Sequence, residues 1–329
     1  MNLNALLGKF EGRRVVVLGD LIADVFVYGE ISRTSREAPV LVLSQRETQL
    51  VPGGAGNAIH NLWALGARPL PVGIVGEDTE GQQLVEYFSK LGIDTSGIRK
   101  VASYQTPTKT RILAGTVHSY RQQVVRLDRG SPLQSPQTVE TIKKRLTTRL
   151  KKSDAVLISD YGYGLVTPEL AATAHGTGLP TTLDSRFAIR DYTGMTAATP
   201  NEPEVEAALG IKIGNDLEKL ERAGRTLLRR FKHEAVLITR GKDGMALFER
   251  GRKTLHIPIH GTDEIADVTG AGDTVIATFT LALASGGTAR EAAELANCAG
   301  GIVVMKHGTR PIQREELAAA IPDIQATRS

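Results

Sequence analysis

The feature that most constrains the fold of this chain is a regular alternation between short apolar runs and longer amphipathic stretches. The apolar runs occupy residues 15–18, 72–75, 155–158, 181–183 and 235–238. The amphipathic stretches lie between them and carry apolar residues every three or four positions, at 81–91, 139–150 and 216–231. Strands that alternate with helices and carry apolar side chains on both faces are typical of a parallel sheet covered on both sides by helices. The pattern therefore predicts an α/β fold of three layers with a mostly parallel central sheet.

Acidic and glycine residues follow several of the apolar runs. Gly19 and Asp20 follow the first run, Asp160 follows the third after a serine, and Asp184 follows the fourth. Ligands of open α/β sheets bind outside the carboxyl ends of the strands. We therefore expect these side chains to lie at the edge of the sheet where a ligand binds.

Two segments interrupt this alternation. Residues 25–50 and 108–128 contain β-rich pieces and no convincing helical pattern. They predict a small antiparallel sheet that forms a lid beside the main fold. The length of 329 residues fits one large α/β domain or two smaller ones. The linker-like stretch at 130–135 is short, so we expect a single domain over residues 1–329 that includes the lid.

The charge balance and the aromatic content argue against a nucleic-acid partner. Lys and Arg total 40 against 36 Asp and Glu, which gives a net charge of +4, and aromatic residues make up 5% of the chain. Nucleic-acid binders concentrate basic and aromatic residues on their surface. The densest basic run, at 143–152, is interrupted by apolar residues at helical spacing. This spacing predicts the solvent face of a helix, with a phosphate-binding patch as the alternative.

The sequence also predicts a cytoplasmic protein with no membrane partner. No apolar run reaches the roughly 18 residues of a membrane-spanning helix. The start of the chain has neither the apolar core nor the cleavage site of a secretory signal. Cys298 is the single cysteine, which excludes an intrachain disulfide and fits a reducing compartment.

The strongest chemical signal is the segment 267–273, with the sequence DVTGAGD, which precedes a long apolar helical pattern. Its small residues allow the N–H groups of Gly270, Ala271 and Gly272 to point at one place, at the positive end of a helix where an anion binds. Asp273 adds a carboxylate in the first turn. Phosphoryl transfer to a hydroxyl needs such an anion hole beside a proton acceptor. The alternative is a glycine-rich helix start whose Asp matches the helix dipole, and the spacing alone leaves both open.

A second glycine-rich segment, GGAGN at 53–57, precedes another helical pattern. Gly53 and Gly54 allow a ligand to lie against the backbone, and Asn57 can donate to and accept from a hydroxyl. The alternative is a tight loop in which Asn57 caps the following helix. The segment is not a dinucleotide-binding fingerprint, because Ile59 occupies the third glycine position, and the chain contains no P-loop sequence.

Taken together, these segments resemble the ribokinase/PfkB carbohydrate kinase family. Residues 53–57 match its sugar-side glycine motif, and residues 267–273 match its catalytic signature. Between them, residues 201–204 match its N-x-x-E motif and residues 239–244 its nucleotide loop. The motifs occur in the family's order and the resemblance covers nearly the whole chain. It implies a ribokinase-like fold with a lid, and transfer of the γ-phosphoryl group of ATP to a sugar hydroxyl with Mg²⁺.

Within this family the chain most resembles the D-glycero-D-manno-heptose-7-phosphate kinases of lipopolysaccharide core synthesis. The matching residues are 19–20 together with Asp24, and the segments 32–40, 108–111, 122–128, 159–162, 273–276 and 306–309. This resemblance implies that a heptose 7-phosphate is converted to its 1,7-bisphosphate. Such kinases are often fused to a nucleotidyltransferase domain. This chain stops where that domain would begin, so we expect a stand-alone kinase.

The resemblance assigns roles to individual residues. Asp273 would be the general base, and the anion hole would be formed by Gly270, Ala271 and Gly272. A hydrated Mg²⁺ would be organised by Asn201 and Glu204, and the nucleotide would be bound by Asn201, Thr239, Gly241, Gly244, Thr269 and Asn297. The sugar would be held by Asp20, Gly53, Gly54, Asn57 and Asp160. Its phosphate would meet cations among Arg33, Lys109, Arg111, Arg126 and Arg186.

Structural roles remain open for some of these residues. Glu204 can also be explained as a carboxylate in the first turn of a helix. Asn297 can be explained as a polar helix residue without a ligand, and each cation as a solvated charge on the lid. Family members often dimerise through their lids, which implies a homodimer. Some also bind K⁺ near the catalytic loop.

Departures from the pattern of the heptose-phosphate kinases leave the sugar open. Tyr163 stands where those kinases usually carry a lysine, and Ser185 and Arg186 stand where they carry proline and lysine. Arg186 can substitute as a cation, although its planar fork differs from a point charge. The alternative is a ribokinase or fructokinase that acts on a neutral sugar. A catalytically silent sugar-binding protein is a third possibility, which the intact motif around Asp273 disfavours.

Overall fold

The computed structural model describes residues 2–115, 122–261, 267–306 and 308–326. Part of the predicted lid segment, 116–121, lies outside the described residues, as does His307 of the matching segment 306–309. The largest element is a nine-stranded sheet in the order β13-β12-β11-β10-β9-β8-β1-β4-β5. Its strands are β1 (Arg14–Gly19), β4 (Arg68–Gly76), β5 (Ile98–Val101), β8 (Ala155–Asp160), β9 (Thr181–Ser185), β10 (Ala197–Ala198), β11 (Ala235–Thr239), β12 (Met245–Glu249) and β13 (Leu255–Ile257).

This central sheet is mostly parallel, as predicted. The strands from β5 through β11 in spatial order run parallel to their neighbours. The hairpin β12–β13 adds an antiparallel edge. All the apolar runs identified in the sequence lie in strands of this sheet. They are apolar throughout because helices cover both faces of the strands.

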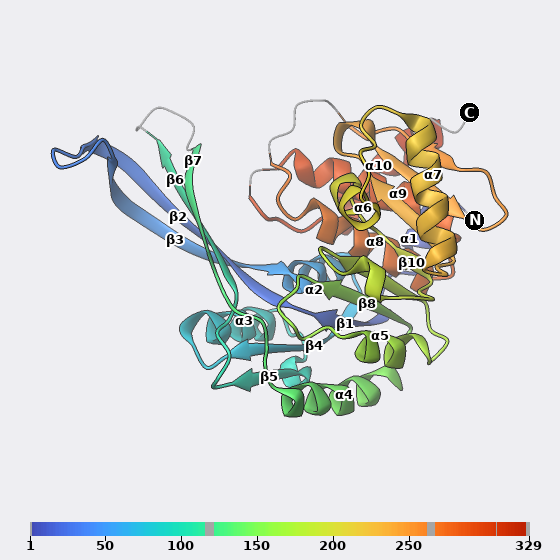
Figure 1. Ribbon diagram of the computed structural model, residues 1–329, viewed down its shortest axis with the longest axis horizontal. Helices are drawn as coiled ribbons and strands as arrows, with labels where there is room; N and C mark the ends of the chain where they lie inside the picture. Colours follow the sequence, from blue (N-terminus) through green and yellow to red (C-terminus); the bar gives the residue numbers. More distant parts are fainter. Residues whose placement is uncertain (1, 116–121, 262–266, 307, 327–329) are drawn as a thin grey trace.

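Helices lie on both sides of the central sheet (Figure 1). Alternate residues of the strands enter different hydrophobic cores. Val15 and Val17 of β1 pack in the core beneath one helical layer, whereas Val16 and Leu18 pack in the core beneath the other. The first layer contains α1 (Leu3–Leu7), α2 (Ala55–Ala64), α3 (Thr79–Lys90), α8 (Ala271–Ala284), α9 (Ala289–Val304) and α10 (Arg314–Ala326). The second contains α4 (Pro136–Leu150), α5 (Pro168–His175), α6 (Glu202–Leu209) and α7 (Leu217–Arg230).

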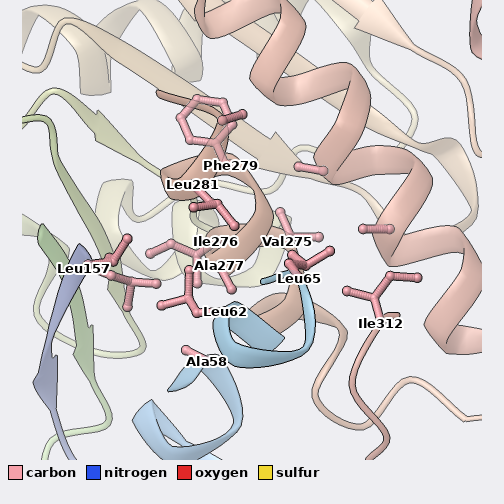
Figure 2. Close-up of a cluster of buried hydrophobic side chains, with 14 of the residues drawn as sticks. Ala58, Leu62, Leu65, Leu157, Val275, Ile276, Ala277, Phe279, Leu281 and Ile312 are labelled. Carbon is pink, nitrogen blue, oxygen red and sulfur yellow. The ribbon is translucent and has the colours of Figure 1, made fainter. Parts of the chain in front are cut away.

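Helix α8 lies in the middle of the larger core. Figure 2 shows its side chains among Leu62 of α2, Leu157 of β8 and Ile312, and Ile276 and Phe279 of α8 are fully buried. A helix that is apolar all round is held on every side by other elements. Its first turn is therefore fixed in position. Although α8 is apolar, neither it nor any other helix in the described part of the chain is long and apolar enough to cross a membrane.

The basic run at 143–152 lies mainly on α4 and contributes to internal contacts. Arg145 donates to the carbonyl oxygens of Ser96 and Ile98, at 2.7 and 3.1 Å. Arg149 pairs with Asp94 at 2.6 Å. These bonds fasten the segment before β5 to α4, so part of the run serves the fold.

A second sheet of four strands, in the order β3-β2-β6-β7, forms the lid. Its strands are β2 (Leu21–Thr34), β3 (Leu41–Gly54), β6 (Thr108–Gly115) and β7 (Gln122–Arg129). In Figure 1 these strands extend away from the central sheet. The pairs β2·β3 and β6·β7 are antiparallel, but β2·β6 is parallel. The prediction of an antiparallel sheet was therefore wrong in this one pairing, because the chain passes through α2, β4, α3 and β5 before it enters β6 from the same end as β2.

The two faces of the lid differ sharply in polarity. Side chains alternate between the faces of a strand, and residues paired across strands share a face. The register pairs Asp24 with Lys109, Phe26 with Arg111 and Arg111 with Arg126, so one face is charged. The opposite face is apolar and carries Val25, Val27, Ile112, Val125 and Leu127.

Candidate active site

The carboxyl ends of β1, β8 and β9 meet the N-termini of α2 and α8 beneath the root of the lid. Asp20 follows β1, Asp160 ends β8 and Asp184 lies in β9, on neighbouring strands. Electrostatic effects link Asp184 with Asp273 and Asp160. The strand ends that the sequence pointed to are therefore brought together.

The two glycine-rich motifs meet at the start of α8. Gly270 is its N-cap, with a φ of 78° that L side chains rarely adopt, and a Cβ there would lie 2.4 Å from Nδ2 of Asn57. That Nδ2 donates to Oδ2 of Asp273 at 2.9 Å and to the Gly270 carbonyl at 3.2 Å. Asn57 does not cap α2, whose N-cap is Gly54 without a side-chain bond. Asn57 instead ties α2 to the predicted base.

Asp273 is buried and held through both carboxylate oxygens. Its Oδ1 accepts a hydrogen bond from the Tyr161 hydroxyl at 2.9 Å, and its Oδ2 accepts the one from Asn57. Burial raises the pKa of Asp273 to about 6; the bonds from Asn57 and Tyr161 oppose this effect and the charge of Asp24 adds to it. A carboxylate with a pKa just below neutrality is suited to accept a proton from a hydroxyl.

The predicted anion hole lies at the first turn of α8. The Ala271 N–H donates to the Val268 carbonyl at 3.3 Å, and the Thr269 N–H donates to Asp267 Oδ1 at 2.9 Å. Among the described residues, a Cβ added at Gly272 would meet nothing within 4 Å. The turn bonds fix the loop, and no described residue fills the space beside Gly272.

Asp20 lies in the same cluster and is a buried carboxylate with one oxygen that no described residue binds. Its Oδ2 accepts from the N–H groups of Tyr161 and Tyr163, at 2.9 and 3.1 Å. Its Oδ1 is buried without a hydrogen-bond partner among the described residues. Burial raises the pKa of Asp20 to about 7, against the backbone bonds that lower it. A buried polar atom left without a partner suits a ligand hydroxyl.

Asp160, predicted to contact the sugar, is used by the protein itself. Its Oδ1 accepts from the Gly162 N–H at 3.0 Å, and its Oδ2 accepts from Ser185 and Tyr192 at 2.8 Å each. Asp160 thereby holds the turn that follows β8. That turn carries Tyr161, whose backbone and side chain contact Asp20 and Asp273.

Gly53 and Gly54 are the last residues of β3, where the lid joins α2. A Cβ at Gly53 would lie 2.4 Å from Asp24 Oδ2. Gly54 has a φ of 56°, and a Cβ there would lie 3.2 Å from the Tyr161 ring. In this structure both glycines admit close approaches of protein groups, which set the lid root against the turn.

Three of the predicted cations lie on the charged face of the lid. Arg111 pairs with Asp24 at 2.6 Å, and both side chains are buried. The Lys109 Nζ lies over the Tyr161 ring, 4.7 Å from its centroid, and burial lowers the pKa of Lys109. Arg126 makes two bonds to Asp128, at 2.8 and 2.9 Å. Each cation is thus already paired or stacked within the protein.

The other two predicted cations differ in their reach. Arg186 is exposed beside the pocket, and its charge opposes the burial that raises the pKa values of Asp184 and Glu204. Arg33 lies near the far end of β2. At about 3.3 Å per residue, β2 carries Arg33 about 30 Å along the strand from Asp24. In a single chain Arg33 therefore lies far from Asp24 and Asp273, and its role at the sugar phosphate stays a prediction.

The segment 201–204 forms a capping box at the start of α6. Oδ1 of Asn201 accepts from the Glu204 N–H, and Oε2 of Glu204 accepts from the Asn201 N–H, both at 2.9 Å. Burial raises the pKa of Glu204. The backbone of Asn201 bridges Thr239 at the end of β11, so these two predicted nucleotide residues lie side by side.

Of the other residues predicted to bind the nucleotide, Gly244 and Asn297 lie against the protein's own backbone. No described residue fills the space beside Gly241. A Cβ at Gly244 would lie 2.1 Å from the Ile257 carbonyl, and the Asn297 Nδ2 donates to the Pro258 carbonyl at 2.8 Å. These contacts fix the segment after β13 against α9. Gly241 has a φ of 56° and a Cβ there would meet nothing within 4 Å.

Two residues of this cluster, Tyr161 and Asp24, received no role from the sequence, whereas Asp184 was already expected at the ligand-binding edge. Tyr161 directly follows Asp160 and lies in the matching segment 159–162. Asp24 matches the heptose-phosphate kinases, but its pairing with Arg111 left no local signal.

Solved structures of known proteins share this architecture. Phosphofructokinase-2 from Escherichia coli in complex with fructose-6-phosphate matches with a TM-score of 0.76 and 17% identity, over 95% of this chain and 99% of that one. Arabidopsis thaliana ribokinase complexed with ribose and ATP matches with a TM-score of 0.70 and 21% identity, over 94% and 99%. At these identities the likeness establishes the fold, which is ribokinase-like.

The fold together with the sequence comparisons defines a phosphotransferase that acts on alcohol groups. Residues 13–316 match the profile of the pfkB family carbohydrate kinases, and the chain belongs to that family. The bifunctional protein HldE of Geobacter sulfurreducens is 39% identical over 326 residues, which cover 97% of this chain and 65% of that protein. The HldE of Mesorhizobium japonicum is 39% identical over 328 residues, 97% of this chain and 64% of that protein. The chain thus spans just under two thirds of the length of these relatives.

Proposed function

We propose that this protein is an ATP-dependent kinase that converts a heptose 7-phosphate to its 1,7-bisphosphate. The observation that carries the proposal is the similarity to HldE over nearly the whole chain, at 39% identity. Within HldE, the matching part corresponds to a heptose-7-phosphate kinase domain. The charged face of the lid, which places Lys109 over Tyr161 and Arg111 beside Asp24, supports an anionic sugar.

In the proposed reaction, Asp273 accepts the proton of the sugar hydroxyl as that oxygen attacks the γ-phosphorus of ATP. The bond from the γ-phosphorus to the bridging oxygen breaks, and ADP leaves. The N-terminus of α8 stabilises the transferring phosphoryl oxygens, with Gly272 beside the space they need. The unused oxygen of Asp20 accepts a second sugar hydroxyl. The lid excludes water and so limits ATP hydrolysis.

Mg²⁺ fits the oxygen-rich group formed by Asn201, Glu204 and Asp184. Mg²⁺ prefers oxygen ligands and retains several waters. Burial and the proximity of Glu204 raise the pKa of Asp184, so a cation there would relieve the repulsion between these carboxylates. When bound, the metal would neutralise charge on the ATP phosphates. Asn201 and Glu204 would hold it through water, since they also cap each other.

A neutral sugar remains the second candidate, and Tyr163 favours it. This residue replaces the ammonium group expected for a sugar phosphate, and its N–H is bound to Asp20. Arg186 is the cation best placed to replace that missing ammonium group. It follows Asp184 by two residues and is exposed, and no carboxylate among the described residues is bonded to its guanidinium.

The test is ADP release with Mg-ATP across a panel of D-glycero-D-manno-heptose 7-phosphate, ribose, fructose and fructose 6-phosphate. We expect kcat/KM for the heptose phosphate to exceed the others by about 10³-fold, which corresponds to roughly 4 kcal/mol of transition-state binding. A preference for ribose or fructose would contradict the proposed substrate. Repeating the assay in Na⁺ and K⁺ buffers tests for a monovalent cation, which one solved structure of E. coli phosphofructokinase-2 contains.

A further inference from the structure

Tyr161 stands between the predicted base and the lid, and no motif of the family resemblance gave it a role. Its hydroxyl donates to Oδ1 of Asp273 at 2.9 Å. The Lys109 Nζ, from lid strand β6, lies over its ring at 4.7 Å from the centroid. Its backbone N–H donates to Asp20. One residue therefore contacts the base, a sugar-site carboxylate and the lid.

We propose that Tyr161 is a positioning residue that keeps Asp273 oriented and ionised for proton abstraction, and that Lys109 holds the Tyr161 ring in place. This inference rests on the proposed function, in which Asp273 is the base. It goes further because it assigns the orientation and ionisation of Asp273 to the Tyr161 side chain, in the turn after β8, and to Lys109 of the lid.

The geometry explains how the orientation is set. A carboxylate oxygen can accept more than one hydrogen bond. Tyr161 donates to one oxygen of Asp273 and Asn57 to the other, which fixes the plane of the carboxylate and leaves further acceptor capacity for a substrate hydroxyl. Burial and the charge of Asp273 hold the pKa of Tyr161 well above its usual value. The phenol therefore stays a donor throughout the working pH range.

Groups from β2, β6, α2 and the turn after β8 act on the ionisation of Asp273. Asp24 on β2 disfavours its ionised form, and Lys109 on β6 and the bonds from Asn57 and Tyr161 favour it. Asp184 on β9 is also coupled to it, and Arg186 acts on Tyr161 and Asp184. Burial disfavours the ionised form of Asp273. The Tyr161 hydroxyl and the Asn57 amide favour it, because each donates a hydrogen bond to the Asp273 carboxylate.

The lid is linked to this bond through Lys109. Lys109 pairs in register with Asp24, and its neighbour Arg111 forms the buried ion pair with Asp24. The root of β6 is thus fixed to β2, and its ammonium group lies on the face of the Tyr161 ring. The negative face of an aromatic ring attracts a cation, and this contact favours the rotamer in which the ring lies beneath the ammonium group.

The test is the pH dependence of kcat in Tyr161→Phe, which keeps the ring and removes the hydroxyl. A hydrogen bond to a charged group stabilises it enough to shift a pKa by about one to two units. We therefore expect the acid limb of the kcat profile to move upward by about one to two pH units. Lys109→Met should move it in the same direction by less. Tyr87→Phe is the matched control, since the Tyr87 hydroxyl contacts His60 outside the pocket.

A direct titration of Asp273 separates this inference from the proposed function. In protein labelled with ¹³C at the aspartate carboxyl carbon, the Asp273 resonance is assigned by its loss in Asp273→Asn. We expect Tyr161→Phe to raise its titration midpoint whether or not the sugar has been identified. An unchanged midpoint in folded Tyr161→Phe would overturn the inference. Absence of kinase activity in the unmodified chain would overturn the proposed function alone.

Discussion

At the scale of single residues, the candidate active site contains carboxylates, such as Asp20 and Asp273, whose burial lowers the free energy of unfolding. Asp273 is buried and balanced by two donors, so its role can be tested without a large change in shape. Asp273→Asn keeps a planar side chain of the same size. We expect phosphorylation to fall by about 10²–10⁴-fold, the usual contribution of a general base, while ATP and sugar still bind. Measuring ADP release together with calorimetric binding of ATP checks this, and near-normal turnover would remove Asp273 as the base.

Asp20 gives a prediction about stability. Its pKa is raised from 3.8 to about 7, so the folded protein keeps this group neutral in a pH range where the unfolded chain ionises it. Below pH 3.8 the group costs nothing. The cost grows as pH rises towards 7 and is complete above it, with a ceiling of about 4 kcal/mol at about 1.4 kcal/mol per unit. Asp20→Asn removes this cost.

We therefore expect Asp20→Asn to be more stable than the unmodified protein, by at least about 1 kcal/mol at pH 8 and by less at pH 5. Urea unfolding at the two pH values measures the difference. The same variant should bind sugar more weakly, because it loses the carboxylate oxygen that has no protein partner. A gain that is larger at pH 5 than at pH 8 would contradict the assignment of the raised pKa.

At the scale of elements, the start of α8 contains two glycines with different physical reasons to be there. Gly270 has a left-handed backbone and touches Asn57, whereas a Cβ at Gly272 meets nothing within 4 Å. We expect Gly270→Ala to lower the free energy of unfolding by about 1–3 kcal/mol. Gly272→Ala should leave it unchanged or raise it by up to about 1 kcal/mol, yet lower kcat by about 10²-fold, because the methyl group enters the space proposed for the phosphoryl group.

Thermal unfolding and ADP release in both variants separate a ligand-contacting glycine from a structural one. Full activity in a stable Gly272→Ala would place the phosphoryl group elsewhere. The pair serves as its own control, since both changes add one methyl group within the same turn.

Elements with a regular period were predictable from the sequence, and contacts between elements were not. The apolar runs became central strands, and the stretch 216–231 became α7, because burial on one or two faces leaves a period that can be counted. The bond from Tyr161 to Asp273 joins residues far apart in the chain. No local pattern reports such a bond.

The same limit applies to the predicted site residues. The resemblance assigned Asp160 to the sugar, and its hydrogen bonds from Ser185 and Tyr192 form only in the folded chain. The family resemblance assigned Arg33 to the sugar phosphate. The strand β2 begins at Leu21, directly after Asp20, and its length places Arg33 far from Asp20 along the strand.

At the scale of the whole molecule, the lid presents an apolar face that, in the described part of the chain, is covered near α3 and exposed farther out. Val25 and Leu50, at the root, pack against the larger core. Farther out, Val125 and Leu127 on the edge strand β7 are 45% and 57% exposed. An exposed apolar sheet face with open edges favours association with another sheet. We therefore propose that two copies of this chain pair through their lids.

The double substitution of Val125 and Leu127 by lysine tests this homodimer. Both side chains are exposed, so the free energy of unfolding of one chain should change by no more than about 0.5 kcal/mol. Two ammonium groups on each copy would repel across the interface, and we expect sedimentation velocity to show a monomer where the unmodified chain is a dimer. Arg126→Lys changes the opposite face of the same strand and should remain dimeric. If the unmodified chain sediments as a monomer at micromolar concentration, the apolar face serves something other than self-association.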